Sequence, residues 1–379
     1  MKVSTKPEQD HKADIEQSMH SQQIWRGEFV VRLPVPICTI ICFVFMSFAA
    51  GQAQIEYTQE IPVPAAASEE LQLAIRARSW PKISELPASP TNTVEWLARI
   101  EETDTAWSSN IPSVLEQTNV TLQRSKVAGV NVHRLTPDEI SPEHRDRLFL
   151  YLHGGAYVYG NGDAGVFEAI LIAHRIGIPV ISVDYRMPPR HPFPAAVDDA
   201  TAVYQALLKT RSASSIIIGG TSAGGGLAIA AVHQFRNLDI PFPGAIYAGT
   251  PWADLTKTGD TLFSNERLDR VLLTYDGGLG AAARLYAGSH DMRDPLISPV
   301  YGDFRNFPPT ILMTGTRDMF LSDVARTHRK LRESDVVAEL HVYEGLSHAG
   351  YLVSPDTPES LNMYSEIDAF IDRFLDQPQ

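Results

Sequence analysis

Apolar and polar residues follow two different patterns along this chain of 379 residues. Between Ile55 and about Ser113 the pattern is helical. ASEELQLAIRA begins with a serine and two glutamates, as helix N-termini prefer, and TVEWLARI spaces Val94, Leu97 and Ile100 along one face. Further along, short apolar runs take over, separated by helical stretches such as residues 195–209. The change indicates a helical layer followed by a domain that is built on a sheet.

Eight of the apolar runs have the composition of β-strands. In chain order they read VTLQ, VNVHRL, RLFLYL, PVISVDY, SIIIGG, GAIYAG, PTILMTG and AELHVYE, and the later ones are almost continuously apolar. Apolar strands that alternate with helices are typical of a mostly parallel sheet covered on both faces. The pattern therefore predicts an α/β fold, and a chain with 44% hydrophobic residues can bury the large core that such a fold needs.

Composition excludes some classes of partner. The chain has 45 acidic and 32 basic residues, a net charge of -13, so it offers no basic patch for a nucleic acid. The histidines are scattered and no H-E-x-x-H motif occurs, so we expect neither a metal nor a cofactor.

Residues 1–53 have the layout of a secretory leader. A basic residue precedes an apolar stretch at 36–50, and small residues follow it up to Ala53. That stretch is shorter than the roughly 20 residues that span a bilayer. We expect cleavage near Ala53 and export to the periplasm or the medium; an uncleaved membrane anchor is the alternative. Cys38 and Cys42 would leave with the leader, so the mature chain would form no disulfide.

A serine set among glycines is the first candidate for chemistry. GGTSAGGG, at 219–226, directly follows the run SIIIGG and contains the motif G-x-S-x-G with Ser222 at its centre. In this motif the serine occupies a strained strand-to-helix turn, with its hydroxyl exposed at the top of the sheet. Glycines fit a turn in which a side chain would collide with the neighbouring chain. A glycine-rich turn that merely ends a strand is the alternative, and phosphate binding is a weaker one because neither phosphate-loop motif is present.

A second glycine-rich turn, HGGAY, follows the run RLFLYL. Turns of this type offer backbone N–H groups to the oxyanion of a tetrahedral intermediate, and each donor can contribute roughly 2.7 to 4 kcal/mol to transition-state stabilisation. We expect Gly154 and Gly155, together with the N–H of Ala223, to form such an oxyanion hole. His153 precedes the candidate nucleophile, whereas the base of G-x-S-x-G hydrolases follows it, so we expect His153 to brace the loop.

Six segments resemble, in order and spacing, the hormone-sensitive-lipase-like family of α/β-hydrolase esterases: HGGAYVYGNG, VISVDYRMPPRHPFPAAVDDA, GGTSAGGGLA, DPLISPVYGD, GTRD and GLSHAG. The GTSAGG form is that of a bacterial subgroup of family IV. The resemblance covers roughly residues 120–375 and implies a serine carboxylesterase on an eight-stranded sheet. It also implies a cap formed by N-terminal helices, here 54–118, and by an insertion at about 251–295 of the catalytic domain, 119–379. Members of the family often prefer short acyl chains and often dimerise through the edge of the last strand.

The acid of a catalytic triad must follow the nucleophile in this fold and precede the histidine. Asp318 lies at the carboxyl end of the run PTILMTG, whereas its rival Asp323 lies five residues on, inside a helical stretch. Asp254 and Asp294 belong to the insertion, where we expect them to hold the cap. We therefore expect Asp318 to be the acid.

Three histidines remain as candidates for the base. His328 lies in a helical stretch and His341 within a strand, whereas His348 lies in the loop GLSHAG after the last strand, from which it can reach Ser222. The family motifs select the same pair, Asp318 and His348.

These residues predict a serine carboxylesterase that forms an acyl-enzyme, and the family resemblance implies short-chain acyl esters as its substrates. A lactone hydrolase or an amidase with the same triad remains an alternative, as does a non-catalytic ligand-binding protein on this scaffold. The chain departs from the family at Ala156, where a third glycine is usual and where a methyl group would narrow the oxyanion hole. It also departs at Arg190, where glutamate is usual.

The tryptophans have two possible roles in substrate choice. Trp252, together with Trp80, Trp96 and Trp107, either forms an aromatic wall of the substrate pocket or belongs to the core of the cap. Burial in the core is the commoner role of such residues.

Overall fold

The computed structural model describes residues 61–77 and 86–376. The expectations for the leader at 1–53 and for Trp80 lie outside these residues. Within them, no helix is both long enough and apolar enough to cross a membrane.

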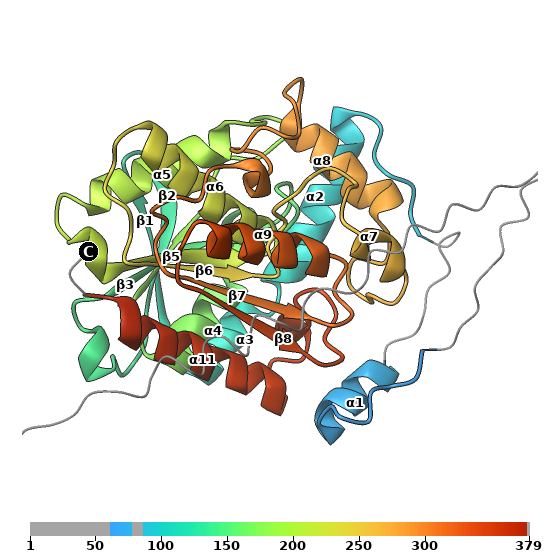
Figure 1. The fold of residues 1–379 in the computed structure, drawn as a ribbon, viewed down its shortest axis with the longest axis horizontal. Coiled ribbons are helices and arrows are strands. Elements are labelled where there is room, and N and C mark those ends of the chain that lie inside the picture. Colours follow the sequence, from blue (N-terminus) through green and yellow to red (C-terminus); the bar gives the residue numbers. More distant parts are fainter. Residues whose placement is uncertain (1–60, 78–85, 377–379) are drawn as a thin grey trace, which may run out of the picture. The chain divides into compact units, whose positions relative to one another are not determined.

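An eight-stranded sheet forms the centre of the described domain (Figure 1). Its strands run in the order β1-β2-β4-β3-β5-β6-β7-β8; β2 is antiparallel to both neighbours and every other pair is parallel. The strands are β1 (Thr121–Val127), β2 (Val130–Thr136), β3 (Leu148–Leu152), β4 (Val180–Val183), β5 (Ile216–Thr221), β6 (Ala245–Gly249), β7 (Thr310–Gly315) and β8 (Ala338–Tyr343). Each of the eight predicted runs contributes one strand, so the predicted α/β fold is confirmed.

The continuous apolar runs form the inner strands because both faces of the sheet are covered by helices. Every residue of β3 to β7 is buried, whereas β1 and β8, at the two edges, are partly exposed. Alternate residues of one strand enter different cores. Ile218 packs in a cluster with residues of α5 (Ala195–Leu207), α6 (Ala223–Asn237) and α9 (Leu321–Glu333), and Ile217 packs in a cluster with residues of α4 (Phe167–Ile176) and α11 (Pro358–Phe374). Figure 1 shows these helices on opposite sides of the sheet.

The helices that cover the sheet are α3 (Ile111–Thr118), α4 (Phe167–Ile176), α5 (Ala195–Leu207), α6 (Ala223–Asn237), α9 (Leu321–Glu333) and α11 (Pro358–Phe374). Further elements are α1 (Glu69–Ala77), α7 (Thr261–Ser264), α10 (Gly350–Val353), the π-helical turn η5 (Tyr275–Leu279) and the 3-10 turns η2 (Pro142–His144), η3 (Gly162–Gly165), η4 (Ala213–Ser215) and η6 (Pro299–Tyr301).

Two helices from distant parts of the chain form a separate layer. They are α2 (Thr93–Ser108), whose N-terminus is capped by the side chain of Asn92, and α8 (Gly280–Ala287) of the insertion. Trp96 of α2 and Ala282 of α8 are buried together with Val158, which follows the HGG turn. The layer therefore packs on the segment after that turn. Of the other N-terminal helices, α1 and α3 pack instead in the core on the α4 and α11 side.

The tryptophans of the described residues divide by burial. Trp96 and Trp252 are buried in the protein core, whereas Trp107 is 44% exposed and packs edge-on against Tyr159. Trp96 packs with Ala282 of α8, which agrees with a place in the core of the cap, whereas Trp252 packs in the core of the sheet domain and stacks on Phe320.

Candidate active site

Ser222 lies in the sharp turn between β5 and α6. Its backbone has φ 62° and ψ -123°, a conformation that costs a residue with a side chain about 1–3 kcal/mol. Hydrogen bonds hold the turn: the N–H of Ser222 donates to the carbonyl of Gly249 (2.8 Å), and the N–H of Trp252 donates to the carbonyl of Ser222 (2.9 Å). A Cβ atom at Gly220 or Gly224 would lie 1.9 Å from the carbonyl oxygen of Leu152. The flanking glycines are thus required by the adjacent strand.

The HGG turn lies beside this serine because β3 and β5 are neighbouring parallel strands, with Leu152 paired to Gly220. A Cβ atom placed on Gly154 would be 3.5 Å from the Cβ of Ser222 and 2.9 Å from a backbone oxygen. Gly155 has φ 110°, and a Cβ atom there would lie 2.2 Å from the carbonyl oxygen of Tyr159. The backbone of the turn therefore approaches the serine more closely than a chain with side chains could.

His153 is buried and braces this turn. Its Nδ1 lies 2.7 Å from the carbonyl oxygen of Gly154, and its ring stacks on Tyr185 with 4.1 Å between ring centres. The hydroxyl of Tyr185 in turn donates to the carbonyl of His153 (2.7 Å). Burial lowers the pKa of His153, which favours the neutral ring and an N–H that donates to the Gly154 carbonyl.

Asp318 and His348 form a buried pair at the carboxyl ends of β7 and β8. Nδ1 of His348 lies 3.1 Å from Oδ1 of Asp318, and both side chains are almost fully buried. The Asp318 carboxylate also accepts from the hydroxyl of Thr314 (2.8 Å) and from the N–H of Phe320 (2.8 Å). These bonds fix the carboxylate with one oxygen facing the imidazole. Asp323 lies on α9, where it accepts from the backbone N–H of Asp254 (3.1 Å).

Packed rings connect this pair to the serine turn. The ring of Phe320 meets His348 edge to face (4.7 Å between centres) and stacks on Trp252 (5.5 Å). The backbone N–H of Trp252 donates to the carbonyl of Ser222. On the other side, the hydroxyl of Tyr351 lies 2.6 Å from that of Thr221. The loop that carries His348 is therefore tied to the serine turn on both sides.

A buried carboxylate lies beneath the serine turn, and we did not foresee it from the sequence. Glu168 on α4 accepts hydroxyl hydrogen bonds from Thr221 (2.7 Å), Tyr247 (2.9 Å) and Tyr151 (2.8 Å). Burial raises the pKa of Glu168, and the three hydroxyl donors lower it. The network anchors the last residue of β5, immediately before Ser222, to α4 and β6.

A second unforeseen carboxylate belongs to the insertion. Asp269 is completely buried and accepts from the backbone N–H of Met319 (2.9 Å) and of His348 (3.2 Å). Its partners lie 50 and 79 residues away along the chain, so no local motif marks it. The sequence offered one signal: Asp269 is a further acidic residue between Ser222 and Asp318, and we considered only Asp254 and Asp294 there.

Asp254 and Asp294, the two insertion acids expected to hold the cap, contact neither Asp318 nor His348 through the hydrogen bonds of their carboxylates. Asp254 is buried and accepts from Arg326 on α9 (2.6 Å) and from the hydroxyl of Tyr301 (2.8 Å). Asp294 accepts from the backbone N–H of Leu296 (2.9 Å). Asp254 thus connects the start of the insertion to α9.

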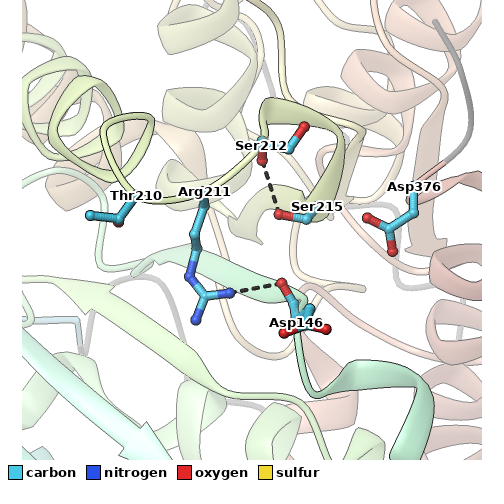
Figure 2. Close-up of a pocket in the computed structure, with 6 residues that line it drawn as sticks. All are labelled: Asp146, Thr210, Arg211, Ser212, Ser215 and Asp376. Atoms are coloured by element: carbon cyan, nitrogen blue, oxygen red, sulfur yellow. Dashed lines mark hydrogen bonds between the residues drawn. The ribbon is translucent and has the colours of Figure 1, made fainter.

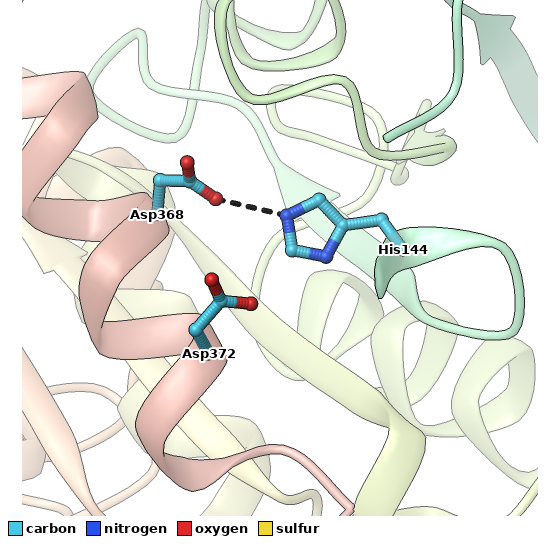
Figure 3. A group of neighbouring side chains, drawn as sticks. All are labelled: His144, Asp368 and Asp372. Atoms are coloured by element: carbon cyan, nitrogen blue, oxygen red, sulfur yellow. Dashed lines mark hydrogen bonds and ion pairs between the residues drawn. The ribbon is translucent and has the colours of Figure 1, made fainter. Parts of the chain in front are cut away.

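A histidine and two aspartates on η2 and α11 form another polar group (Figure 3). His144 bonds to Asp368 through Nε2 (2.9 Å), and the guanidinium of Arg147 contacts both Asp372 (2.5 Å) and the other ring nitrogen of His144 (3.3 Å). Because a cationic side chain already occupies the group, these residues form an ion-pair network that fastens α11 to the start of β3.

A pocket opens at the opposite end of β5 from Ser222. Figure 2 shows the residues that line it: Asp146, Thr210, Arg211, Ser212, Ser215 and Asp376. The guanidinium of Arg211 donates to the carbonyl of Asp146, and the hydroxyl of Ser215 donates to the carbonyl of Ser212. The polar groups bond to each other across the pocket, and it lies at the amino end of the strand rather than at the catalytic end.

The sequence and the fold of this chain are similar to those of known hydrolases. A family model described as the alpha/beta hydrolase fold matches residues 149–352. An acetyl-hydrolase of Streptomyces hygroscopicus is 31% identical over 64% of this chain and 81% of its own length. The crystal structure of the esterase E25 is 44% identical with a TM-score of 0.82, covering 84% of this chain and 97% of that one. An esterase from the bacterial hormone-sensitive lipase family is 29% identical with a TM-score of 0.70, covering 82% and 99%.

Proposed function

We propose a serine-dependent mechanism for this chain, which belongs to the hormone-sensitive-lipase-like branch of the α/β-hydrolase family and is a carboxylic ester hydrolase. The observation that carries the proposal is the buried Asp318–His348 pair, joined at 3.1 Å and connected through Phe320 and Trp252 to the strained turn of Ser222. A nucleophile, a base and a residue that orients the base are the parts that such catalysis needs. Because the chain belongs to a family of ester hydrolases, we favour catalysis over the alternative of a non-catalytic ligand-binding protein.

Each group has one task in this mechanism. With Nδ1–H donated to Asp318, the free Nε2 of His348 takes the proton of the Ser222 hydroxyl as the oxygen attacks the ester carbonyl carbon. The resulting oxyanion accepts hydrogen bonds from the backbone N–H groups of Gly154, Gly155 and Ala223. The carbon–oxygen bond to the alcohol then breaks, and His348 returns the proton to the leaving alcohol. Water hydrolyses the acyl-enzyme through the same groups.

Short acyl chains are the proposed substrates. Tyr157, two residues after Gly155 of the HGG turn, is fully buried and stacks on Tyr286 of α8 at 3.9 Å between ring centres. Trp252 lies nearby, so large rings fill the volume beside the serine turn. Ala156 adds a methyl group next to the proposed oxyanion hole. The name acetyl-hydrolase of the Streptomyces relative supports the same preference.

The test is hydrolysis of p-nitrophenyl esters from acetyl to dodecanoyl by the full chain and by Ser222→Ala. We expect the rate to be greatest with the short acyl groups and to vanish in the variant. A rate that rises toward dodecanoyl would contradict the substrate class, and full activity in the variant would contradict the mechanism. Matched p-nitroanilides separate an esterase from an amidase, because an amide requires protonation of its leaving nitrogen.

Dimerisation through β8 is a further part of the proposal. Among residues 61–77 and 86–376, β8 is an edge strand that pairs with β7 alone, and Val342 on it is 45% exposed. An exposed strand edge can pair with a second copy of itself. We expect Val342→Lys to lower the molar mass measured by light scattering from that of a dimer to that of a monomer. A monomeric wild-type chain would contradict this part.

Export after cleavage near Ala53 is the proposed localisation. The support is the basic, apolar and small-residue layout of residues 1–53. The mass of the protein recovered from cells that express the full chain decides it: loss of the leader is expected, and a full-length product held in the membrane would favour the anchor instead.

A further inference from the structure

We propose that Asp269 is a positioning residue that holds the two loops carrying Asp318 and His348 together through one of its carboxylate oxygens. The inference rests on the serine mechanism proposed above, because it assigns a role to a residue that acts through that acid and base.

The two oxygens of this carboxylate have different partners. Oδ1 accepts from the backbone N–H of Val271 (2.9 Å) and of Leu272 (3.2 Å), which closes a turn of the insertion. Oδ2 accepts from the N–H of Met319 (2.9 Å) and from that of His348 itself (3.2 Å). Met319 directly follows the triad acid Asp318. One oxygen therefore fixes the side chain, and the other bridges the acid loop and the histidine loop.

The neighbouring residues of the insertion contact the same two loops. The side-chain amide of Asn265 donates to the carbonyls of Thr316 (3.2 Å) and Asp318 (2.8 Å). The backbone N–H of Arg270 donates to the hydroxyl of Ser347 (3.2 Å). The segment 265–270 therefore lies across both loops, with the Asp269 carboxylate as the group that contacts both at once.

This bridge matters because a single hydrogen bond orients the base. His348 is held to Asp318 at 3.1 Å, and the two loops can shift relative to one another unless something fixes the distance between them. A displacement of about 1 Å at a catalytic group can lower the rate about 100-fold. Loss of the bridge should therefore lower kcat and leave substrate binding nearly unchanged.

The partners of Asp269 require it to be ionised. All four are N–H donors, which suit a carboxylate; a protonated carboxyl would have to direct its own O–H at one of them. The charged groups that face it are Asp318 and His348. Burial, and next the charge of Asp318, raise the pKa of Asp269 to about 6, and His348 opposes the shift. The bridge should accordingly weaken as the pH falls through about 6.

The experiment compares the wild-type full chain with the variants Asp269→Asn and Asp254→Asn. Asp254 is the matched control because it is a buried aspartate of the same insertion whose carboxylate bonds to Arg326 and Tyr301 rather than to either loop. The kcat and KM for p-nitrophenyl acetate are measured from about pH 5 to about pH 8.5, with folding followed by circular dichroism. For Asp269→Asn we expect kcat to fall about 10- to 100-fold and KM to stay within about twofold. Asp254→Asn should keep the wild-type kcat.

The pH profile gives a readout that a purely structural role would not move. Below about pH 6, log kcat/KM should fall more steeply in the wild type than in Asp269→Asn, because the carboxylate of Asp269 becomes protonated there. The variant should lack this part of the decrease, since the amide does not titrate.

Three results would overturn the inference: wild-type kcat in Asp269→Asn, an equal loss in Asp254→Asn, or a wild-type kcat/KM that does not fall between about pH 6 and about pH 5. The third result can be measured even if Asp269→Asn does not fold. Serine catalysis is judged separately, because an active wild type and an inactive Ser222→Ala support it whatever Asp269 does.

Discussion

At the scale of single residues, the candidate site concentrates conformational strain at its nucleophile. Ser222 has φ 62°, and the hydrogen bonds to Gly249 and Trp252 hold it there. The turn pushes the side chain away from its own strand and helix, so that a hydroxyl rather than backbone meets the substrate. The two neighbouring carboxylates are equally buried but have different partners. Asp318 faces the imidazole of His348, whereas Asp323, at 1% exposure, accepts from a backbone N–H.

The triad acid can be tested against its rival. Asp318→Asn should lower kcat about 10⁴-fold, because an amide cannot hold the Nδ1–H tautomer of His348. Asp323→Asn is the matched control: burial raises the pKa of Asp323 well above its usual value, so its neutral form resembles the amide. Steady-state kinetics with p-nitrophenyl acetate should show near wild-type kcat for Asp323→Asn. If Asp323→Asn were the damaging change, the acid would be misassigned.

At the scale of elements, α2 is joined to the segment that follows the HGG turn. Asp104 on α2 accepts from the backbone N–H of Gly160 (2.7 Å) and from the side-chain amide of Asn161 (2.7 Å). Val158, two residues before Gly160, packs beneath Trp96 of the same helix. An N-terminal helix and the proposed oxyanion loop are thus connected by both polar and apolar contacts.

Removing the polar contact should loosen that loop. Hydrogen bonds to a charged group contribute about 1.5–3 kcal/mol, so we expect Asp104→Ala to lower kcat/KM on the order of tenfold. The control is Glu102→Ala, an exposed acid on the same helix, which should keep full activity. Equal kinetics for the two variants would show that α2 does not support the loop.

The sequence predicted elements better than contacts between them. Strands were recognisable because burial on both faces requires uninterrupted apolar runs, as in residues 216–218, and Ser222 and Gly154 could be located because each follows such a run. The bridging role of Asp269 and the hydroxyl network of Glu168 were not recognisable. Both are carboxylates whose partners come from other elements, so only the folded chain reveals why a charge is buried there.

At the scale of the whole molecule, one buried histidine should make stability depend on pH. His233 of α6 packs against Phe304 and Phe307, and its Nε2 lies 3.1 Å from the carbonyl of Pro299. Burial lowers its pKa to about 4. Between its ordinary value near 6.5 and about 4, the unfolded chain binds a proton that the folded chain does not. Protonation in this range therefore favours unfolding.

Replacement of His233 should remove this dependence. In the wild type, the contribution of His233 to the free energy of unfolding should fall by about 3 kcal/mol between about pH 6.5 and about pH 4. His233→Gln, which does not titrate, should lack this part of the decrease. Urea unfolding at several pH values measures the difference; parallel curves for the two proteins would show that His233 does not account for it.

The central claim, that Ser222 is the nucleophile, is tested most directly by covalent labelling. The full chain is treated with diethyl p-nitrophenyl phosphate, which phosphorylates activated serines, and is then digested for peptide mass spectrometry. We predict one diethylphosphoryl group, on Ser222, formed in step with the loss of esterase activity, and no label in Ser222→Ala. A label on another residue, or loss of activity without a label on Ser222, would contradict the account.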